Sequence, residues 1–597
     1  MDEPPFGEDL LSDPAALVEF GANLTKASLI GQQAILQSVG GIDPTTLMSF
    51  DPLAQSNPLL DAVMTGIASP ESLAQTQAKL AQRTFDVWQD ACSAFFEGLF
   101  DVPSADRRFA GEAWRQPYFD AIRRAYDVNA KLLSALSSRT DLGDAKANRR
   151  LQFLTKLLTD LFSPSNFLAS NPDALAEALR TRGESLVRGM ENFAADLKRG
   201  GGELAISQTD MSKFAIGENL ATTPGKVVFQ NELLQLIQYA PATDQVREIP
   251  LLIVTALINK YYILDLQPGN SLVRWLTEQG FTVFITSWAN PDVQHASKTF
   301  EDYMAAGLLT AMDKVIDQCG VEHINVLGYC ISGTLLGCTL AYLAAKKIES
   351  PVSSATFLAA QHDFSDAGDL GLFIDDGILH EAERRMDKAG GVLPGQSMSE
   401  AFNLLRANDL IFSFLVNNYL LGKTPKAFDL LYWNADQTRI PKALGLWYLR
   451  AFYQENRLAN GSLELAGARL DLSAVTTPVF VQSAVDDHIA PPESVYRGAR
   501  LFGGPVTFVL AGSGHIAGVV NPPSAQKYQH WTNRQFPETL RDWKAGAQEA
   551  KGSWWPAWAE WLHERSGRTI AARDPSAGPL PPIEDAPGAY VKVRSSS

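Results

Sequence analysis

The sequence predicts an α/β fold with a mostly parallel sheet and an inserted helical cap, preceded by an all-helical N-terminal domain. Beyond about residue 203, short apolar runs alternate with longer helical patterns, which is typical of a sheet buried on both faces. Before residue 200, apolar residues recur at spacings of three and four, as in amphipathic helices. A chain of 597 residues also exceeds one ordinary core, so two domains are expected.

The expected helical domain spans residues 1–200. The stretches "ESLAQTQAKLAQRTFDVWQDACSAFFEGLF" and "NRRLQFLTKLLTDLFSPSNFLAS" carry the helical spacing, and the pairs Ser163-Pro164 and Asn171-Pro172 predict turns between helices. The apolar stripes indicate the core of a bundle, or else a face offered to a partner or to an apolar product surface. Cys92 lies within one stripe and is interpreted as a buried structural residue.

A joint at residues 200–202, in "KRGGGELA", separates this domain from one expected over 203–597. Between about 362 and 470 the alternation fails and helical segments such as "EAFNLLRANDLIFSFLVNNYLL" dominate, which indicates the cap. The tail from Asp574 is rich in Pro and Ala and is expected to be irregular. The expected strands are "PLLIVTAL", "FTVFITSW", "INVLGY", "SATFLAA", "TPVFVQSAVDD" and "VTFVLAGSGH".

Composition excludes several classes of protein. The net charge of −16 argues against a nucleic-acid partner, because phosphate binding needs a basic surface. Four cysteines, none in metal-ligand spacing, indicate neither a disulfide framework nor a metal site, and favour a reducing cytoplasm. The start "MDEPPFGEDL" lacks the features of a secretory signal, and the longest apolar runs are about half a membrane span, so no transmembrane segment is expected.

A cysteine stands where many hydrolases carry a nucleophilic serine. In "INVLGYCISGT", Cys330 follows an expected strand and precedes an expected helix, which is the setting of a nucleophile elbow. That turn needs small neighbours, and Gly328 supplies one. Two residues beyond the cysteine stands Ser332, which is also small, followed by Gly333.

An acid and a histidine follow this cysteine in the order that the elbow's fold requires. Asp487 ends the expected strand "TPVFVQSAVDD", and His515 follows "VTFVL". Asp486 is an alternative acid, whereas His488 is interpreted as a local hydrogen-bonding residue. The remaining cysteines and histidines receive no chemical role: Cys319, Cys338, His295, His323, His362, His380, His530 and His563.

Several blocks together resemble the polyhydroxyalkanoate synthases, polyester-forming relatives of the α/β-hydrolases, of the type that works without a second subunit. They are "GENLATTPGKVVFQNELLQLIQY", "INKYYILDLQPGNSLVRWLTEQGFTVFITSWANPD", "NVLGYCISGT", "DLLYWNAD", "DDHIAPPESVY" and "SGHIAGVVNPP", covering about residues 215–525, with "APGAYVK" near the end. Where that family typically reads Gly-x-Cys-x-Gly-Gly, this chain reads Gly-x-Cys-x-Ser-Gly.

The resemblance implies an α/β-hydrolase fold and polymerisation of 3-hydroxyacyl-coenzyme A, with short acyl units favoured and coenzyme A as the leaving group. A thiol suits this reaction, because acyl transfer from coenzyme A to Cys330 exchanges one thioester for another and keeps the acyl group activated. His515 would deprotonate Cys330. The N–H of Ile331 and a second N–H near Asn259 would stabilise the oxyanion. Asp487 would orient His515 or help activate the attacking hydroxyl. No cofactor is implied.

The resemblance also implies partners and a location. A homodimer is expected, with Trp433 near its interface or, equally, in the core of the cap, and the enzyme would lie in the cytoplasm at the surface of polyester granules. Two rival functions stay open: a cysteine-dependent hydrolase of esters, lactones or thioesters with the same triad, and a catalytically silent scaffold that coats granules.

Overall fold

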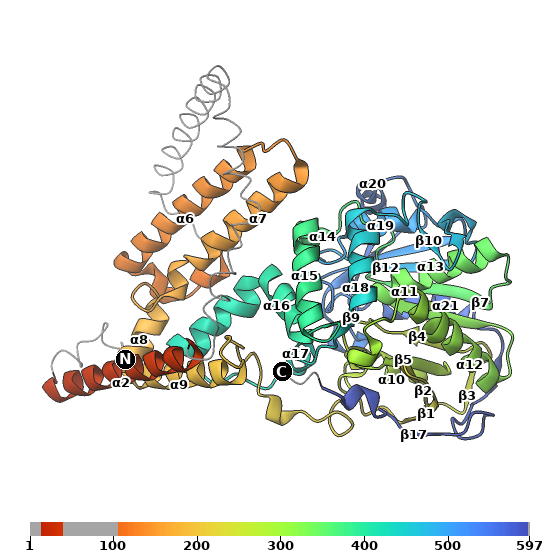
Figure 1. Cartoon of the computed structure of the whole chain (residues 1–597), viewed down its shortest axis with the longest axis horizontal. Helices are drawn as coiled ribbons and strands as arrows, with labels where there is room; N and C mark the ends of the chain where they lie inside the picture. The colour runs from red at the N-terminus through yellow and green to blue at the C-terminus, as the bar shows by residue number, and fades with distance from the viewer. Residues whose placement is uncertain (1–12, 40–105, 595–597) are drawn as a thin grey trace, which may run out of the picture. The chain divides into compact units, whose positions relative to one another are not determined.

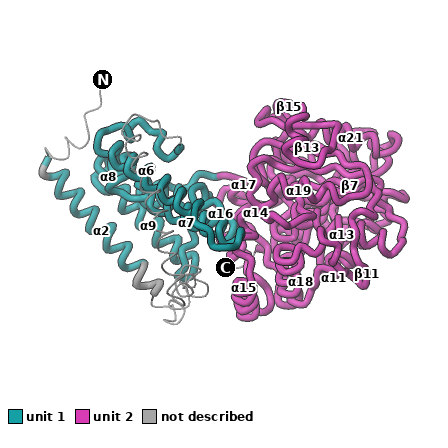
Figure 2. Tube along the Cα trace, turned by 90° about the horizontal axis from the view of Figure 1, so that it is seen from above, with its two compact units in different colours: residues 1–210, 401–427 teal, residues 211–400, 428–597 magenta. Residues whose placement is uncertain are grey.

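The computed structural model describes residues 13–39 and 106–594 of the chain. Two compact units divide it: unit 1 comprises residues 1–210 and 401–427, and unit 2 comprises residues 211–400 and 428–597 (Figure 2). Within the described residues, no helix is long and apolar enough to cross a membrane.

Unit 2 is built on an eleven-stranded sheet in the order β15-β14-β13-β12-β7-β6-β4-β5-β2-β1-β17 (Figure 1). The six strands from β13 to β5 run parallel, and the strands outside them on both sides pair antiparallel. The strands are β1 Gly225–Gln230, β2 Leu234–Tyr239, β4 Leu251–Val254, β5 Val283–Trp288, β6 Ile324–Tyr329, β7 Val352–Leu358, β12 Val479–Ala484, β13 Val506–Ala511, β14 Gln529–Thr532, β15 Gln548–Lys551 and β17 Glu584–Asp585.

The six parallel strands are those that the sequence predicts. β4, β5, β6 and β12 are buried along their whole length, which explains why they read as unbroken apolar runs. The antiparallel strands were not predicted from the sequence. β15 is exposed at every position and has the polar sequence QEAK, so no apolar pattern marks it.

Helices cover the sheet and form the cap. α13 follows β6 at the position expected for "SGTLLGCTLAYLAAK", and a π-helical segment, Tyr303–Leu309, precedes α12. Two-stranded ladders supplement the helices of unit 2: β3 Gln245–Arg247 with β16 Thr569–Ala571, β8 Val392–Leu393 with β9 Ile440–Pro441, and β10 Glu464–Leu465 with β11 Ala468–Arg469. The helices are α10 Leu272–Glu278, α11 Phe300–Asp302, α12 Thr310–Cys319, α13 Ile331–Lys346, α14 Gly368–Gly371, α15 Asp376–Lys388, α17 Asp429–Ala435, α18 Lys442–Tyr448, α19 Pro492–Ala499, α20 Leu540–Ala545 and α21 Trp555–His563.

The described part of unit 1 is helical, as predicted. Pro164 opens a 3-10 turn, and Pro172 opens α8 behind the N-cap Asn171, whose side chain accepts from the Ala174 N–H at 3.0 Å. The expected helix containing Cys92 lies outside the described residues. The helices are α2 Pro14–Val39, α6 Pro117–Arg139, α7 Ala145–Leu161, α8 Pro172–Arg180 and α9 Glu184–Arg199, together with the second part of α16 Gly395–Leu405, from residue 401 on.

The apolar stripe of α7 is not bundle core. Asp160 is the one buried residue of this helix, every position of which is described, while Leu158 is 55% exposed. Exposed apolar side chains also occur on α2 and α6, including Val18 and Tyr118. Among the described residues, these helices therefore present apolar side chains at the surface, and whether a partner or an apolar product covers them stays a prediction.

Residues 401–427, which we expected in the cap, pack with the helices of unit 1 instead. Their chain lies directly on α9: a Cβ on Gly189 would stand 1.9 Å from the Tyr419 carbonyl oxygen. The Tyr419 hydroxyl donates to Asp196 Oδ2 at 2.6 Å. The cap of unit 2 accordingly consists of residues on either side of this excursion, from about 362 to 400 and from 428 to 470.

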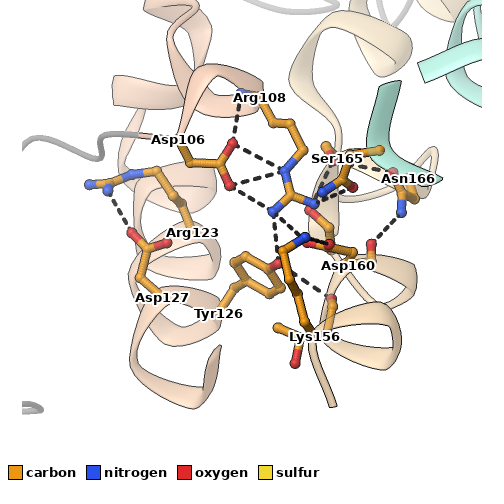
Figure 3. Close-up of polar contacts among 12 residues, drawn as sticks. Asp106, Arg108, Arg123, Tyr126, Asp127, Lys156, Asp160, Ser165 and Asn166 are labelled. Carbon is orange, nitrogen blue, oxygen red and sulfur yellow. Dashed lines mark hydrogen bonds and ion pairs between the residues drawn. The ribbon is translucent and has the colours of Figure 1, made fainter. Parts of the chain in front are cut away.

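A polar cluster around Arg108 joins several parts of unit 1 (Figure 3). The Arg108 guanidinium pairs with Asp106 at 2.6 Å and with Asp160 at 3.2 Å. It also donates to the Tyr126 hydroxyl at 3.0 Å and to Asn408 Oδ1 at 3.1 Å. One side chain thus links α6, α7 and the 401–427 segment.

The described part of the tail is irregular, as expected, apart from the short strand β17 and a 3-10 turn over Tyr590–Lys592. β17 pairs with β1, and the Tyr590 hydroxyl donates to the Asn231 carbonyl at 2.7 Å. Val591 is buried. The segment "APGAYVK" therefore follows the edge strand directly and is held beside β1.

Candidate functional site

Cys330 occupies the sharp turn between β6 and α13. Its backbone angles are φ 53° and ψ −127°, in the positive-φ region that residues with a Cβ rarely adopt. Its N–H donates to the Leu358 carbonyl at 2.9 Å, and its carbonyl accepts from the Gly333 N–H at 2.8 Å. These bonds hold the strained residue in place, so that its thiol lies at the carboxyl end of the parallel strands.

Two glycines allow the strand and the helix to approach each other at this turn. A Cβ on Gly328 would lie 2.7 Å from the Gly333 Cα, and a Cβ on Gly333 would lie 2.3 Å from the Ala360 Cβ. The position after Cys330 that must lack a side chain is therefore 333, not 332. Ser332 is completely buried and keeps its side chain, which donates from Oγ to the Thr255 carbonyl at 2.6 Å.

Asp487 and His515 meet beside this turn. Asp487 follows β12 and His515 follows β13, and both strands run parallel to β6 in the same sheet. His515 Nδ1 lies 2.7 Å from Asp487 Oδ2, and both side chains are buried. The Asp487 carboxylate is fixed in turn, because Oδ1 accepts from the N–H groups of Ile489 and Ala490 at 2.9 and 2.8 Å.

The surroundings of His515 strengthen its basicity. Burial alone would lower the pKa of the imidazole, but the charges of Asp487 and Cys330, and its hydrogen bonds to both side chains, raise that pKa well above its ordinary value. The Tyr329 ring stacks on the imidazole with 5.9 Å between ring centroids. A raised pKa makes the His515 imidazole a stronger base toward the Cys330 thiol.

Two tyrosines of the cap, Tyr448 and Tyr453, lie close enough to Cys330 to interact with its charge, and sequence reasoning missed both. Burial raises the pKa of Tyr453, and the charges of Cys330 and Asp487 raise it further. Burial, Tyr453 and Cys330 act in the same direction on the pKa of Tyr448. Both residues lie at or within the π-helical segment Leu449–Gln454, whose wide turns bring together side chains five positions apart.

The other candidates lie apart from this arrangement. Asp486 is exposed, so the adjacent Asp487 is the carboxylate that contacts the histidine. His488 lies in the same loop, where its carbonyl accepts from the Asp369 N–H at 3.3 Å. Burial raises the pKa of the Cys319 thiol to about 11 and that of Cys338 further still, which keeps both thiols protonated.

The two expected oxyanion residues differ in their setting. Ile331 is the first residue of α13, so its N–H has no acceptor one turn earlier in the helix. Asn259 forms an isolated bridge with Gln437 of the cap. Among the described residues, no hydrogen bond joins Asn259 to Cys330, Asp487 or His515.

The loop that contains Asn259 is anchored to the cap by a buried ion pair that sequence reasoning missed. Lys260 Nζ lies 2.7 Å from Asp436 Oδ1, and the Tyr262 hydroxyl donates to Asp436 Oδ2 at 2.9 Å. Trp433 is also buried here, and its indole N–H donates to the Lys260 carbonyl at 2.8 Å. In this chain Trp433 therefore packs within the cap core.

Two family models match successive, overlapping parts of the chain. Residues 105–276 match the family model for the poly-beta-hydroxybutyrate polymerase (PhaC) N-terminus. Residues 249–522 match the model for the alpha/beta hydrolase fold. The parallel sheet, the elbow and the order of Cys330, Asp487 and His515 agree with that fold.

Curated relatives cover nearly the whole chain. A poly(3-hydroxyalkanoate) polymerase of Methylorubrum extorquens is 45% identical, over 89% of this chain and 88% of its own. The poly(3-hydroxyalkanoate) polymerase subunit PhaC of Rhizobium meliloti is 44% identical, over 89% and 87%. That of Cupriavidus necator is 42% identical, over 91% and 92%.

Proposed function

The chain belongs to the poly(3-hydroxyalkanoate) polymerase family and is an acyltransferase, and from this premise we propose that it polymerises short 3-hydroxyacyl units from their coenzyme A thioesters through an acyl group carried on Cys330. The observation that carries the proposal is the strained Cys330 turn beside the 2.7 Å pair of His515 and Asp487. The nucleophile, its base and the base's partner occupy three neighbouring loops at one end of the sheet.

Acylation follows from this geometry. His515 takes the proton of Cys330, and the sulfur attacks the thioester carbonyl. The N–H of Ile331 and one from the loop near Asn259 stabilise the oxyanion that forms. The carbon–sulfur bond to coenzyme A then breaks, and the leaving thiolate receives the proton from His515. The products are free coenzyme A and an acyl group in thioester linkage to Cys330.

Chain growth requires a hydroxyl to attack a thioester. A base removes the proton of the 3-hydroxyl as its oxygen bonds to the acyl carbon, and the released thiolate is protonated in turn. Asp487 serves this step either by orienting His515 or by helping to activate the hydroxyl. Because a thiol needs less activation than a secondary hydroxyl, we favour the second role.

We further propose that the enzyme needs no cofactor, with coenzyme A entering only as part of the substrate. It would act as a homodimer in the cytoplasm, at the surface of the polyester granules it makes. The exposed apolar side chains of α2, α6 and α7, such as Val18, Tyr118 and Leu158, support attachment of unit 1 to such a surface. Water must be excluded from the acyl-enzyme, which is a role for the cap.

The decisive experiment supplies the purified full chain with 3-hydroxybutyryl-coenzyme A. We expect coenzyme A release together with insoluble polyester. Free 3-hydroxybutyrate as the sole product would instead identify a cysteine-dependent hydrolase of esters, lactones or thioesters. No turnover at all would favour a silent granule scaffold.

A further inference from the structure

We propose that Ser332 is a positioning residue that ties the nucleophile turn to the loop supplying the second oxyanion donor. The inference rests on the proposed acyl transfer through Cys330. Ser332 lies two residues beyond Cys330 in the first turn of α13, completely buried. Serine hydroxyls in helices commonly bond to a carbonyl of their own helix, but this one donates across to the Thr255 carbonyl at 2.6 Å.

Thr255 is the first residue after β4 and begins the loop that runs to Lys260. β5 holds it from the other side: the Thr255 N–H donates to Thr286 Oγ1 at 3.1 Å, and its hydroxyl donates to the Thr286 carbonyl at 2.9 Å. The Trp288 indole N–H donates to the Thr255 carbonyl at 2.8 Å. That carbonyl therefore receives two donors, one from the neighbouring strand and one from the helix that starts at the nucleophile.

The direction of this carbonyl determines the direction of the next N–H. A trans peptide is planar, with its C=O and N–H pointing opposite ways, so the bonds from Ser332 and Trp288 together fix the peptide between Thr255 and Ala256, from which the loop continues to Asn259. Oxyanion stabilisation depends on donors held in place before the charge develops. The Ser332 hydroxyl sets where the loop's donors lie relative to the Cys330 sulfur, because it belongs to the same helical turn as that cysteine.

The matched control is a hydroxyl on the same helix that lacks this connection. Thr339 is completely buried, and its Oγ1 donates to the Leu335 carbonyl of α13 at 2.7 Å. Ser332→Ala and Thr339→Val each remove one buried hydroxyl from α13. Only the first removes a hydrogen bond to the loop after β4.

Two reactions of Cys330 separate positioning of the oxyanion loop from damage to the turn. Alkylation by iodoacetamide needs the Cys330 thiolate but forms no oxyanion. Acylation by 3-hydroxybutyryl-coenzyme A or by p-nitrophenyl butyrate needs the thiolate and also passes through an oxyanion that must be stabilised. For Ser332→Ala in the full chain, we expect the single-turnover acylation rate to fall about tenfold or more. The alkylation rate and its pH profile should stay within about twofold of wild type. Thr339→Val should leave both rates unchanged.

Each other outcome overturns the inference. Equal losses in alkylation and acylation would make Ser332 a packing residue of the turn, and an unchanged acylation rate would deny it any role. If wild type forms no polymer but is acylated by the p-nitrophenyl ester, the polymerase proposal fails while the ester still tests Ser332. A wild-type protein acylated by neither donor would overturn both proposals.

Discussion

Different interactions stabilise the interior of unit 1 and the interior of unit 2. In unit 2, one continuous apolar cluster includes strands β4 and β6 and reaches the fully buried indoles of Trp543 and Trp558. Among the described residues of unit 1, the apolar clusters are small, one around Ala178 and another around Trp114. Polar contacts to Arg108 connect the parts of unit 1 instead (Figure 3).

The two kinds of interaction predict different responses of stability and of the reaction to substitution. Apolar burial is insensitive to pH and fixes strand ends firmly, and the proposed reacting groups stand at those ends. A polar cluster depends on each partner being present and correctly charged. We therefore expect changes at the site in unit 2 to alter the reaction and leave the fold intact, and changes in unit 1 to alter stability first.

The largest expected effect is the loss of activity in Cys330→Ala. Without the sulfur no acyl-enzyme forms, so coenzyme A release and polymer formation should fall to background while the circular dichroism spectrum is unchanged. Cys330→Ser should be nearly as poor, because His515 must then deprotonate an alcohol and the acyl group loses its thioester activation. Cys338→Ala, a buried cysteine on the same helix, should cost about 1 kcal/mol of stability and keep activity. Appreciable polymerisation by Cys330→Ala would place the nucleophile elsewhere.

Asp487→Asn should slow polymerisation by about a hundredfold or more, and the step that slows identifies its role. If Asp487 mainly activates the hydroxyl, rapid-quench measurement should show a normal first burst of coenzyme A release followed by stalled growth. A burst slowed as much as steady-state turnover would restrict Asp487 to orienting His515. The control variant Asp486→Asn, which changes the exposed neighbouring carboxylate, should match wild type in the first burst of coenzyme A release and in the later turnover.

The sequence predicted the parts of the molecule whose signals are local. β4, β5 and β6 read as strands because unbroken apolar runs are buried on both faces of the sheet. The positions of Cys330, Asp487 and His515 could be inferred because each follows such a run, and parallel strands bring their carboxyl ends to one edge. Catalytic roles for these residues stay a prediction until the variants are measured.

Features that depend on distant partners were not predictable. The packing of Tyr419 on Gly189 joins residues 230 positions apart, and nothing in either local pattern marks it. The Lys260–Asp436 ion pair is likewise hidden, since a lysine or an aspartate in a sequence usually indicates a solvated surface. The edge strand β15 has no apolar face from which to read it.

Gly189→Ala tests the close packing within unit 1. A methyl group would stand 1.9 Å from the Tyr419 carbonyl oxygen, so α9 or the 401–427 segment must shift, at a cost of about 3 kcal/mol. Hydrogen exchange should show lost protection in α9 while β6 in unit 2 stays protected. In the matched control Gly21→Ala, on α2, the new methyl group meets nothing within 4 Å, and added helix propensity should stabilise the helix by about 0.5–1 kcal/mol. Unchanged protection of α9 would show that the chain around Gly189 and Tyr419 accommodates a methyl group without loss of stability.

Asp265→Asn tests the effect of a buried carboxyl group in unit 2. Burial raises the pKa of Asp265 to about 6, although the Ser271 and Thr223 hydroxyls oppose that rise. A raised carboxyl pKa means that ionisation costs stability, so wild type should lose stability as the pH rises from about 4 through 6. The asparagine does not ionise, and between pH 4 and 8 its stability should gain about 2–3 kcal/mol relative to wild type. Urea unfolding at several pH values measures this difference, and parallel curves for the two proteins would contradict it.

The smallest expected effect, Arg108→Lys, tests whether the polar cluster of unit 1 needs the shape of the guanidinium or only its charge. A lysine keeps the positive charge but cannot contact Asp106, Tyr126 and Asn408 at the same time, so unit 1 should lose about 1–2 kcal/mol, after allowance for partial exposure to solvent. The control Arg180→Lys, at a 71% exposed arginine paired with Glu177, should leave the unfolding midpoint unchanged.

The pH dependence of the Arg108→Lys effect has a definite sign. Burial would raise the pKa of Asp106, but its bonds with Arg108 outweigh burial and lower it below the ordinary value of 3.8. A lowered carboxyl pKa contributes stability above about pH 4 and loses it as the pH falls through the lowered pKa. The difference in unfolding free energy between wild type and Arg108→Lys should therefore narrow below about pH 4. The effect of Asp265 in unit 2 falls in a separate range, because that carboxyl becomes protonated as the pH falls from about 6 to 4. Hydrogen exchange in α6 and α7 follows unit 1 separately, and a gap that widened in acid would show that Asp106 is not the partner that matters.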